Sequence, residues 1–358
     1  MIELYRYLDD LRPVRCPGYG LVFPEVIALK RRQLVILLII LLAPAWCAGE
    51  SVVGFLVPVS GLGDQSFNDM TYAGLIQAKN QYQFTFIREQ CDGFTDAARE
   101  AAMDRLLDRG AGVVVVNGWE FQDLITRYAK NYRDRIFIIN DYPLPGFDNV
   151  AATVFGQHEG AFLAGTLAGL MTKTGRVGFI GGMDMPVIRA FSVGFTEGVH
   201  FARPDTRIEE VFLAGRNSDI SGFNDPGLGF AQAGKLYDRG VDIIFGAAGL
   251  SGNGIIRAAA ARKLFVIGVD ADQDHMAKGY VLTSVVKRLD TATFMMVQEV
   301  MEGRFVPGIH TFNLRNGGVS LTPMAYTRHL IPPEILLRLE ATQEEIIEGK
   351  RKVTDALH

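Results

Sequence analysis

Short apolar segments alternate with amphipathic segments of helical length along most of this 358-residue chain, and the alternation starts twice. The first series opens at Ser51–Asn80, where an apolar, β-branched run leads through a glycine-rich turn to Ser66, which stands at the N-cap position of a helix. The second series opens at Arg176–Ile180. Strands that alternate with helices form parallel sheets with crossover helices. The pattern therefore predicts an α/β protein of two similar lobes with a hinged ligand cleft between them.

Polar and aromatic residues follow the predicted strands at the edge where open α/β sheets bind small ligands. Phe67, Asn68 and Asp69 come directly after the predicted N-cap, and Asp141 follows a strand expected at Ile136–Asn140. An amide both donates and accepts hydrogen bonds, whereas a carboxylate only accepts them. These residues predict a polar crevice with an aromatic wall, although Asp141 taken alone could equally cap its own turn.

The N-terminal region has the pattern of an export signal. Lys30-Arg31-Arg32 precede nine apolar residues, Leu34–Leu42, and small residues end the segment. The apolar run is too short for a mature membrane anchor, so it predicts a cleaved secretory signal at residues 30–48, with a transmembrane helix as the alternative. Residues 1–29 fit no part of a signal, and we interpret them as an upstream extension from a misplaced start site. We expect the mature protein in the periplasm or on the outer face of the plasma membrane.

Cys47 raises the question of lipid attachment. A bacterial lipobox has leucine at the third position before the cysteine and a small residue directly before it, but this chain has Pro44 and Trp46 there. We therefore expect ordinary cleavage near Ala45–Ala48, with lipidation at Cys47 as the alternative. Cys91 would then be the only cysteine of the mature chain, and one thiol cannot form an internal disulfide.

Composition and missing motifs argue against several classes of function. The net charge of −4 and the lack of basic clusters beyond the signal argue against a nucleic-acid partner. No G-x-S-x-G, H-E-x-x-H or C-x-x-C motif occurs, so we expect no enzyme activity, no cofactor and no metal site.

Gly61–Ser66 resembles a dinucleotide-binding loop but lacks its third glycine, which makes a nucleotide-cofactor enzyme the remote alternative. Asp270, Asp272 and Asp274 are spaced like the start of a calcium loop, but His275 occupies the position that requires glycine.

Seven short motifs lie in order between Ser51 and Phe312. They are G-D-Q-S-F-N-D (63–69), E-G-A-F-L-A-G (159–165), G-R-V-G-F-I-G-G-M-D-M-P (175–186), F-N-D-P (223–226), A-A-G-L-S-G-N-G (247–254), G-V-D-A-D-Q (268–273) and L-T-S-V-V-K (282–287). Any one of them is weak, but the ordered set resembles the basic membrane protein (Bmp) family of ABC transporter substrate-binding proteins, known as purine-nucleoside receptors. The resemblance implies the type 1 periplasmic-binding fold and a receptor that delivers a purine nucleoside or related base to an ABC permease in the inner membrane.

The resemblance also implies how a base would be bound. Phe67 and Phe223, one from each lobe, would stack on the flat ring at roughly 1 to 3 kcal/mol each, with ordinary core packing as the alternative for either residue. Asn68 and Asp141 would read the edge of the base. Family members often carry an acidic residue at the end of the first strand, whereas this chain has Pro58-Val59-Ser60. The resemblance therefore leaves the identity of the base open.

For the sugar, the resemblance implies three further residues. Asp270 would accept hydrogen bonds from both ribose hydroxyls, and Lys287 would bind the same sugar while neutralising that carboxylate. Gly249 would let backbone amides approach the ligand where a side chain would clash. A structural salt bridge is the alternative for Asp270 and Lys287, and the two interpretations are compatible. Trp119 would add either a stacking surface or packing at the rim.

The alternation and the resemblance together predict the lobe boundaries. The N-terminal lobe comprises residues 49–155 plus 288–306, and the C-terminal lobe comprises residues 156–287 plus 307–358. Hinges are expected near Phe155, Lys287 and Pro307. We expect a monomer whose partners are a small-molecule ligand and a permease. The alternative is a ligand-sensing receptor of the same fold that reports to a membrane signalling protein.

Overall fold

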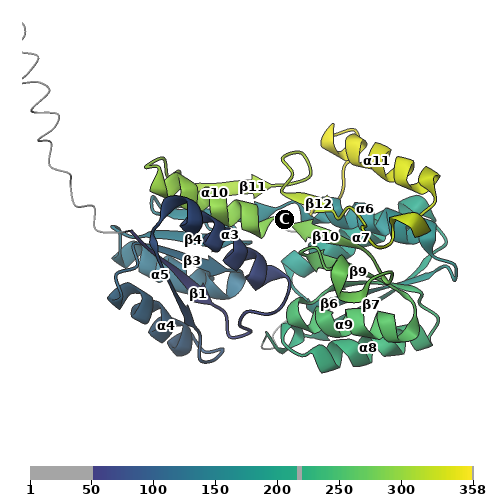
Figure 1. Ribbon diagram of the computed structural model, residues 1–358, viewed down its shortest axis with the longest axis horizontal. Coiled ribbons are helices and arrows are strands. Elements are labelled where there is room, and N and C mark those ends of the chain that lie inside the picture. The colour runs from purple at the N-terminus through teal and green to yellow at the C-terminus, as the bar shows by residue number, and fades with distance from the viewer. Residues whose placement is uncertain (1–50, 216–219, 357–358) are drawn as a thin grey trace, which may run out of the picture. The chain divides into compact units, whose positions relative to one another are not determined.

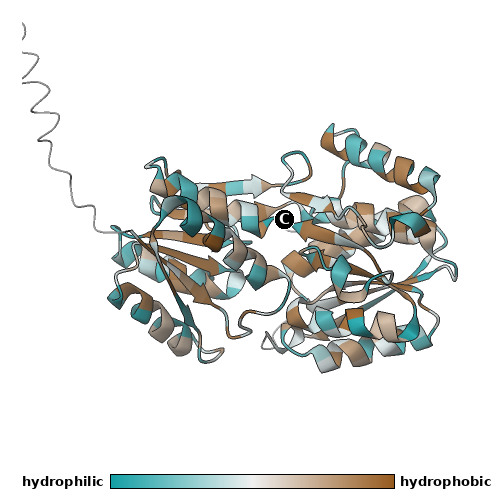
Figure 2. Cartoon of the chain, viewed as in Figure 1, coloured by the Kyte–Doolittle hydropathy of each residue, from teal (hydrophilic) through white to brown (hydrophobic). Residues whose placement is uncertain are grey.

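The computed structural model describes residues 51–215 and 220–356, which contain two six-stranded sheets flanked by helices (Figure 1). The predicted signal and upstream extension lie outside the described residues. Within the described ranges, no helix combines the length and the hydropathy that a membrane crossing requires. Figure 2 shows hydrophobic strands between layers of helices whose outer faces are hydrophilic. Cys91 is buried and free.

The first lobe is built on a parallel sheet with the strand order β11-β5-β4-β3-β1-β2. Its strands are β1 (Val52–Val57), β2 (Thr85–Gln90), β3 (Val113–Asn117), β4 (Ile136–Asn140), β5 (Val150–Phe155) and β11 (Gly308–Phe312). Its helices are α3 (Phe67–Tyr82), α4 (Asp96–Asp108), α5 (Gln122–Asn131) and α10 (Leu289–Met301). Helices α3 and α10 share one hydrophobic core with the sheet, and α4 and α5 share another. Strand β3 is buried throughout, as expected of a central strand covered on both faces.

The second lobe repeats this arrangement in a sheet with the order β12-β10-β9-β8-β6-β7. Its strands are β6 (Arg176–Met183), β7 (Arg207–Ala214), β8 (Ile243–Ala247), β9 (Phe265–Asp270), β10 (Val281–Lys287) and β12 (Val319–Leu321). Its helices are α6 (Gln157–Met171), α7 (Pro186–Ala202), α8 (Pro226–Asp238), α9 (Gly249–Arg262) and α11 (Pro333–Ile347). Strand β12 is antiparallel to β10, and the other pairs are parallel. The five strands β6 to β10 thus repeat the order of β1 to β5, as the restarted alternation predicts.

Within the described residues, the chain passes between the two sheets three times. The first two passages follow Phe155 and Lys287, as predicted. The third lies at residues 313–318, after β11, rather than at Pro307. The predicted boundaries had assigned this segment to the C-terminal lobe, but β11 pairs with β5 and lies in the first sheet. Apart from the buried Phe312, its residues alternate between half-buried and exposed, as in an edge strand, so no continuous apolar run marks it in the sequence.

The mixed charges of residues 334–350 predict a surface helix with a solvated face, and most of this segment lies in helix α11. It packs against α6, and Leu339, Thr342 and Ile346 are buried on its inner side. Leu337 on the same helix is 65% exposed. The expectation of a solvated face therefore holds for one side of the helix only.

Helices α6 and α7 pack together so closely that glycine lines their contact. A Cβ at Gly165 would lie 2.1 Å from the carbonyl oxygen of Phe195, and a Cβ at Gly198 would lie 2.0 Å from that of Phe162. Both distances are under the 3.0 Å that real Cβ atoms essentially never show. The glycine and alanine content of residues 159–169 predicts such close packing, and the contact confirms it.

We expect Gly198→Ala to lower the free energy of unfolding by about 1 to 3 kcal/mol, because the added methyl group forces the two helices apart. Chemical denaturation measures the change. Gly252→Ala is the matched control: Gly252 also lies in a helix, but a Cβ there would meet nothing within 4 Å. Helix propensity alone should leave that variant unchanged or raise its stability by up to about 1 kcal/mol. Equal stability of the two variants would show that the helices do not need a glycine at position 198.

Candidate ligand-binding site

A mostly apolar pocket lies between the carboxyl ends of the strands of the two lobes. It holds about 820 Å³ of space free of protein atoms, counting the open solvent at its mouth. The structure brings all seven residues that the sequence predicted to this pocket: Phe67, Asn68, Asp141, Phe223, Gly249, Asp270 and Lys287. Trp119 also lines it, and the Trp119 side chain is 40% exposed.

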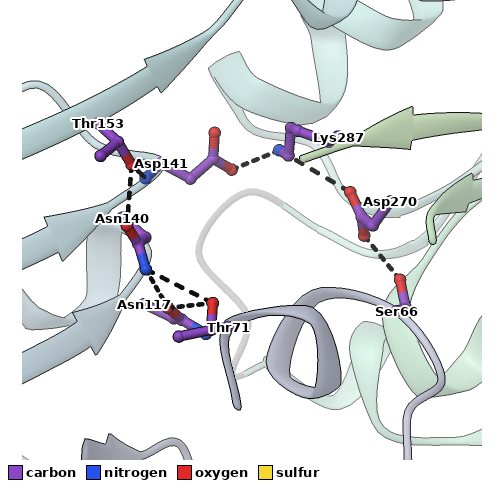
Figure 3. A network of polar contacts seen from close by, with 8 residues as sticks. All are labelled: Ser66, Thr71, Asn117, Asn140, Asp141, Thr153, Asp270 and Lys287. Atoms are coloured by element: carbon purple, nitrogen blue, oxygen red, sulfur yellow. Dashed lines mark hydrogen bonds and ion pairs between the residues drawn. The ribbon is translucent and has the colours of Figure 1, made fainter. Parts of the chain in front are cut away.

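Lys287, the last residue of β10, connects two carboxylates that come from different lobes (Figure 3). Its Nζ lies 2.6 Å from Oδ2 of Asp141 and 3.9 Å from Oδ1 of Asp270. Asp141 directly follows β4, and Asp270 ends β9. Both aspartates have positive φ, 61° and 63°, a region that aspartate enters more readily than most residues. The same backbone turn thus aims one carboxylate from each lobe at a single ammonium.

The ammonium of Lys287 is almost fully buried, with 1% of the residue exposed. The rings of Phe67, Phe155 and Phe191 surround it, with centroids 5.3 to 5.5 Å from Nζ. Cation–π attraction to these rings stabilises the charge. Burial raises the pKa of Asp141, although the neighbouring Lys287 lowers it. Two carboxylates therefore share one buried cation, and this arrangement favours a ligand that donates hydrogen bonds.

Asp270 has one oxygen bound within the protein and one without a hydrogen-bond partner. Its Oδ2 accepts a hydrogen bond of 2.7 Å from the hydroxyl of Ser66, which lies in the first lobe. Its Oδ1 is buried and accepts no hydrogen bond. A buried acceptor of this kind is costly unless it is satisfied, so a ligand hydroxyl at this position would be stabilising.

Asn68 lines the pocket, but its amide is already used inside the first lobe. Its Nδ2 donates to Oγ of Ser60 at 3.1 Å and to the carbonyl of Gly61 at 2.9 Å. Its Oδ1 accepts from Nδ2 of Asn117 at 3.2 Å. An amide has two N–H groups, so only one lone pair of Oδ1 is left for a ligand. The predicted role of Asn68 as both donor and acceptor for a base would require this network to open.

A buried polar network lies behind Asn117 and supports Asp141 (Figure 3). Oδ1 of Asn117 accepts from Oγ1 of Thr71 at 3.0 Å and from Nδ2 of Asn140 at 3.2 Å. Oγ1 of Thr153 donates to Oδ1 of Asn140 at 3.0 Å and accepts from the backbone N–H of Asp141 at 3.3 Å. All the side chains in this chain of bonds are buried. A satisfied buried network is rigid, so it holds Asp141 toward Lys287.

Asp64, Asn117 and Glu120 line the pocket without having been predicted. Asn117 ends a strand after four valines, which is the same signal that drew attention to Asp141. Asp64 accepts hydrogen bonds from the backbone N–H groups of Ser66, Asn68 and Asp69, which ties it to the start of α3. Burial raises the pKa of Asp64 to about 6 despite these donors.

Glu120 lies in the short 3₁₀ helix η1 (Trp119–Phe121) and has Arg99 at 3.5 Å as its ion-pair partner. Its side chain is 11% exposed, and burial raises its pKa to about 7. Asp64 and Glu120 thus add two acidic side chains to the lining of the pocket.

The raised pKa of Glu120 predicts that the free energy of unfolding falls as the pH rises from about 4.5 to about 7. The unfolded chain loses the Glu120 proton near pH 4.5 and the folded chain loses it near pH 7. The stability that protonated Glu120 contributes is therefore complete below pH 4.5 and lost above pH 7. This contribution to the free energy of unfolding amounts to about 3 kcal/mol. Denaturation at several pH values should show a flatter slope of unfolding free energy against pH for Glu120→Gln than for the control Glu334→Gln, which changes an exposed glutamate. If the unfolding free energies of the two variants change in parallel between pH 4.5 and pH 7, Glu120 is ionised in the folded protein over that range.

Two lobes with repeated parallel sheets, three connecting passages and a pocket between them define the class of two-lobed solute-binding proteins. The chain belongs to the Bmp family, because the family model of PnrA-like ABC transporter substrate-binding proteins matches residues 51–357. This match confirms the resemblance that the ordered motifs predicted.

Individual relatives agree with this assignment. The ABC transporter nucleoside-binding protein BmpA of Lactococcus lactis subsp. cremoris is 30% identical over 315 residues, 81% of this chain and 85% of the relative. Basic membrane protein A of Borreliella afzelii is 27% identical over 316 residues, 84% of this chain and 93% of the relative. A solved solute-binding protein of an ABC transporter system from Aeropyrum pernix K1 superposes with a TM-score of 0.77 at 27% identity, covering 85% of this chain and 93% of that one. The predicted type 1 periplasmic-binding fold is confirmed.

Proposed function

We propose that this protein is the extracytoplasmic receptor of an ABC transporter and that it binds a purine nucleoside or a related base between its lobes. Its family consists of substrate-binding proteins of ABC transporters, which are not enzymes. The observation that carries the proposal is the meeting of the seven predicted residues in one pocket between the lobes. These residues come from both lobes and from the passage between them, so a ligand there would contact both halves at once.

The pocket offers the flat apolar surfaces that a purine requires. Phe67 from the first lobe and Phe223 from the second line it, and both are partly buried. Trp119 adds a third aromatic side chain at the same pocket. Aromatic faces bind bases of any identity by stacking, so the choice among bases would come from polar groups. Asp141, Glu120 and the remaining lone pair of Asn68 are the groups that would make that choice.

The charged groups of the pocket suit a ribose. Oδ1 of Asp270 is a buried acceptor without a donor, and a sugar hydroxyl would satisfy it. Lys287 carries three N–H donors, of which Asp141 takes one at 2.6 Å. A second hydroxyl oxygen could accept from the ammonium, and the same pair of residues would then bind neighbouring hydroxyls. Free bases lack these groups and should bind more weakly than nucleosides.

Binding between two hinged lobes couples ligand capture to closure. The closed lobes would present the surface that the permease recognises, and export by the predicted signal would bring the protein to the same side of the membrane as the ligand. A monomer is sufficient for this role.

Calorimetric titration of the chain from Gly49 onward with adenosine, guanosine, inosine, xanthine and adenine tests the proposal. We expect micromolar or tighter binding of at least one nucleoside, with the corresponding free base bound more weakly. If none of the five compounds gives a heat of binding, purines are removed from the proposal.

A further inference from the structure

Besides the pocket, the two lobes touch through a second set of contacts centred on Gln65. The Nε2 of Gln273 donates to the backbone carbonyl of Gln65 at 3.2 Å. Nε2 of His275 lies 3.1 Å from Oε1 of Gln65. His275 belongs to the short 3₁₀ helix η3 (Asp274–Ala277) of the second lobe, whereas Gln65 precedes α3 of the first. None of these three residues lines the pocket.

The loop that carries Gln65 is held in shape by its own carboxylates. Asp69 accepts hydrogen bonds of 2.8 Å from the backbone N–H groups of both Gly63 and Gln65. Gln65 has a φ of 51°, so its backbone is in the left-handed region. Asp64 ties the following residues down in the same way. The direction of the Gln65 carbonyl is therefore set by the loop itself and does not depend on the contact with the second lobe.

Gln273 is equally well positioned on the opposite side. The residue is 2% exposed, and its Oε1 accepts from the backbone N–H of Val269 at 3.0 Å. Its own backbone N–H donates to Oγ of Ser284 at 3.1 Å. The side chain thus spans the turn that contains Asp270 and leaves its Nε2 directed at Gln65. Both partners are preorganised, so little conformational entropy is lost when they meet.

The loop couples this contact to the pocket. Ser66 and Phe67 follow Gln65 directly: Ser66 binds Asp270, and Phe67 lines the pocket. Gln273 lies on the same turn as Asp270. Any separation of the lobes that frees a ligand would break the Gln65–Gln273 bond at the same time.

We propose that Gln65 and Gln273 form a latch between the lobes, which stabilises their closed arrangement and slows release of the bound molecule. The inference rests on the proposed function for the identity of that molecule, and on the contacts between the lobes for the latch itself. Both glutamines act as positioning residues, because neither touches the pocket. The bond joins two residues outside the pocket, so the latch contributes to the closed state whether or not the pocket is filled.

Gln273→Glu is the sharpest test of the latch. The substituted carboxylate keeps an oxygen that can accept from Val269, but it cannot donate to the Gln65 carbonyl, which it would repel. We expect the rate of ligand dissociation to rise about five- to thirtyfold while the association rate changes little. Gln81→Glu is the matched control, since Gln81 is exposed and bonds only to the adjacent Tyr82 within the first lobe.

Stopped-flow fluorescence measures the rates, because Trp119 is the only tryptophan of the chain from Gly49 onward and it lines the pocket. The probe is adenosine, guanosine or inosine, whichever binds the wild-type chain most tightly. Small-angle scattering of the ligand-free proteins provides a second measurement, in which Gln273→Glu should have the larger radius of gyration. A larger radius without nucleoside binding would support the latch and contradict the proposed function. Unchanged dissociation and an unchanged radius, in a variant that unfolds at the wild-type temperature, would overturn the latch.

Discussion

Lys287→Met should lower the free energy of unfolding by about 3 to 5 kcal/mol. The substitution keeps most of the apolar stem, which lies among three phenylalanine rings, but it removes the cation that Asp141 and Asp270 share. Two buried carboxylates would then face one pocket without compensation, and at least one of them would have to take up a proton. The loss should therefore be largest at neutral pH and smaller in acid.

Lys278→Met is the control for this experiment. Lys278 is exposed and lies over the ring of Tyr326, so its loss should change stability by less than about 1 kcal/mol. Denaturant unfolding at pH 5 and pH 8 measures both variants. Adding Asp141→Asn to Lys287→Met should restore part of the lost stability, because it removes one of the two stranded charges. A Lys287→Met protein as stable as the Lys278→Met control would show that the buried cluster does not depend on its cation.

The double variant Phe67→Ala/Phe223→Ala should lose most of the affinity for both nucleosides and free bases. Each ring is expected to contribute roughly 1 to 3 kcal/mol by stacking, so the two together correspond to about 30-fold or far more in the dissociation constant. The effect should be similar for a nucleoside and its base, because stacking involves only the ring. Calorimetric titration of both ligand types measures it.

Folding must be monitored alongside this titration, because Phe223 also packs against Gly182, where a Cβ would lie 2.3 Å from its ring. Phe94→Ala/Phe230→Ala is a control with one exposed phenylalanine removed from each lobe, and it should bind normally. Loss of nucleoside affinity with base affinity retained in the Phe67/Phe223 variant would contradict stacking by these rings.

The parts of the fold that were predictable are those whose residues are buried on both faces. Strands such as β3 and β4 are continuous apolar runs, each ending in an asparagine. Strands β11 and β12 were not predicted, for a physical reason. β11 is a half-exposed edge strand, and β12 has three residues that are stabilised by antiparallel pairing with β10 rather than by local preference. The local sequence does not indicate a pairing strand that lies elsewhere in the chain.

The residues of the site also include some that could be predicted from the sequence and some that could not. Residues at the carboxyl ends of strands, such as Asp141 and Asp270, could be predicted because topology brings those ends together. The bond from Asn117 to the side-chain oxygen of Asn68 could not be predicted, since the two residues are distant in the chain. The contact between Gln65 and Gln273 spans 208 positions, so only the folded structure brings it to light.

The most direct test of the central claim is a crystal structure of the chain from Gly49 onward with the nucleoside that binds most tightly in the titration. We expect the base between Phe67 and Phe223, with the ribose hydroxyls within hydrogen-bonding distance of Asp270 and Lys287. A nucleoside bound outside this pocket, or one whose sugar points away from both charged residues, would contradict it.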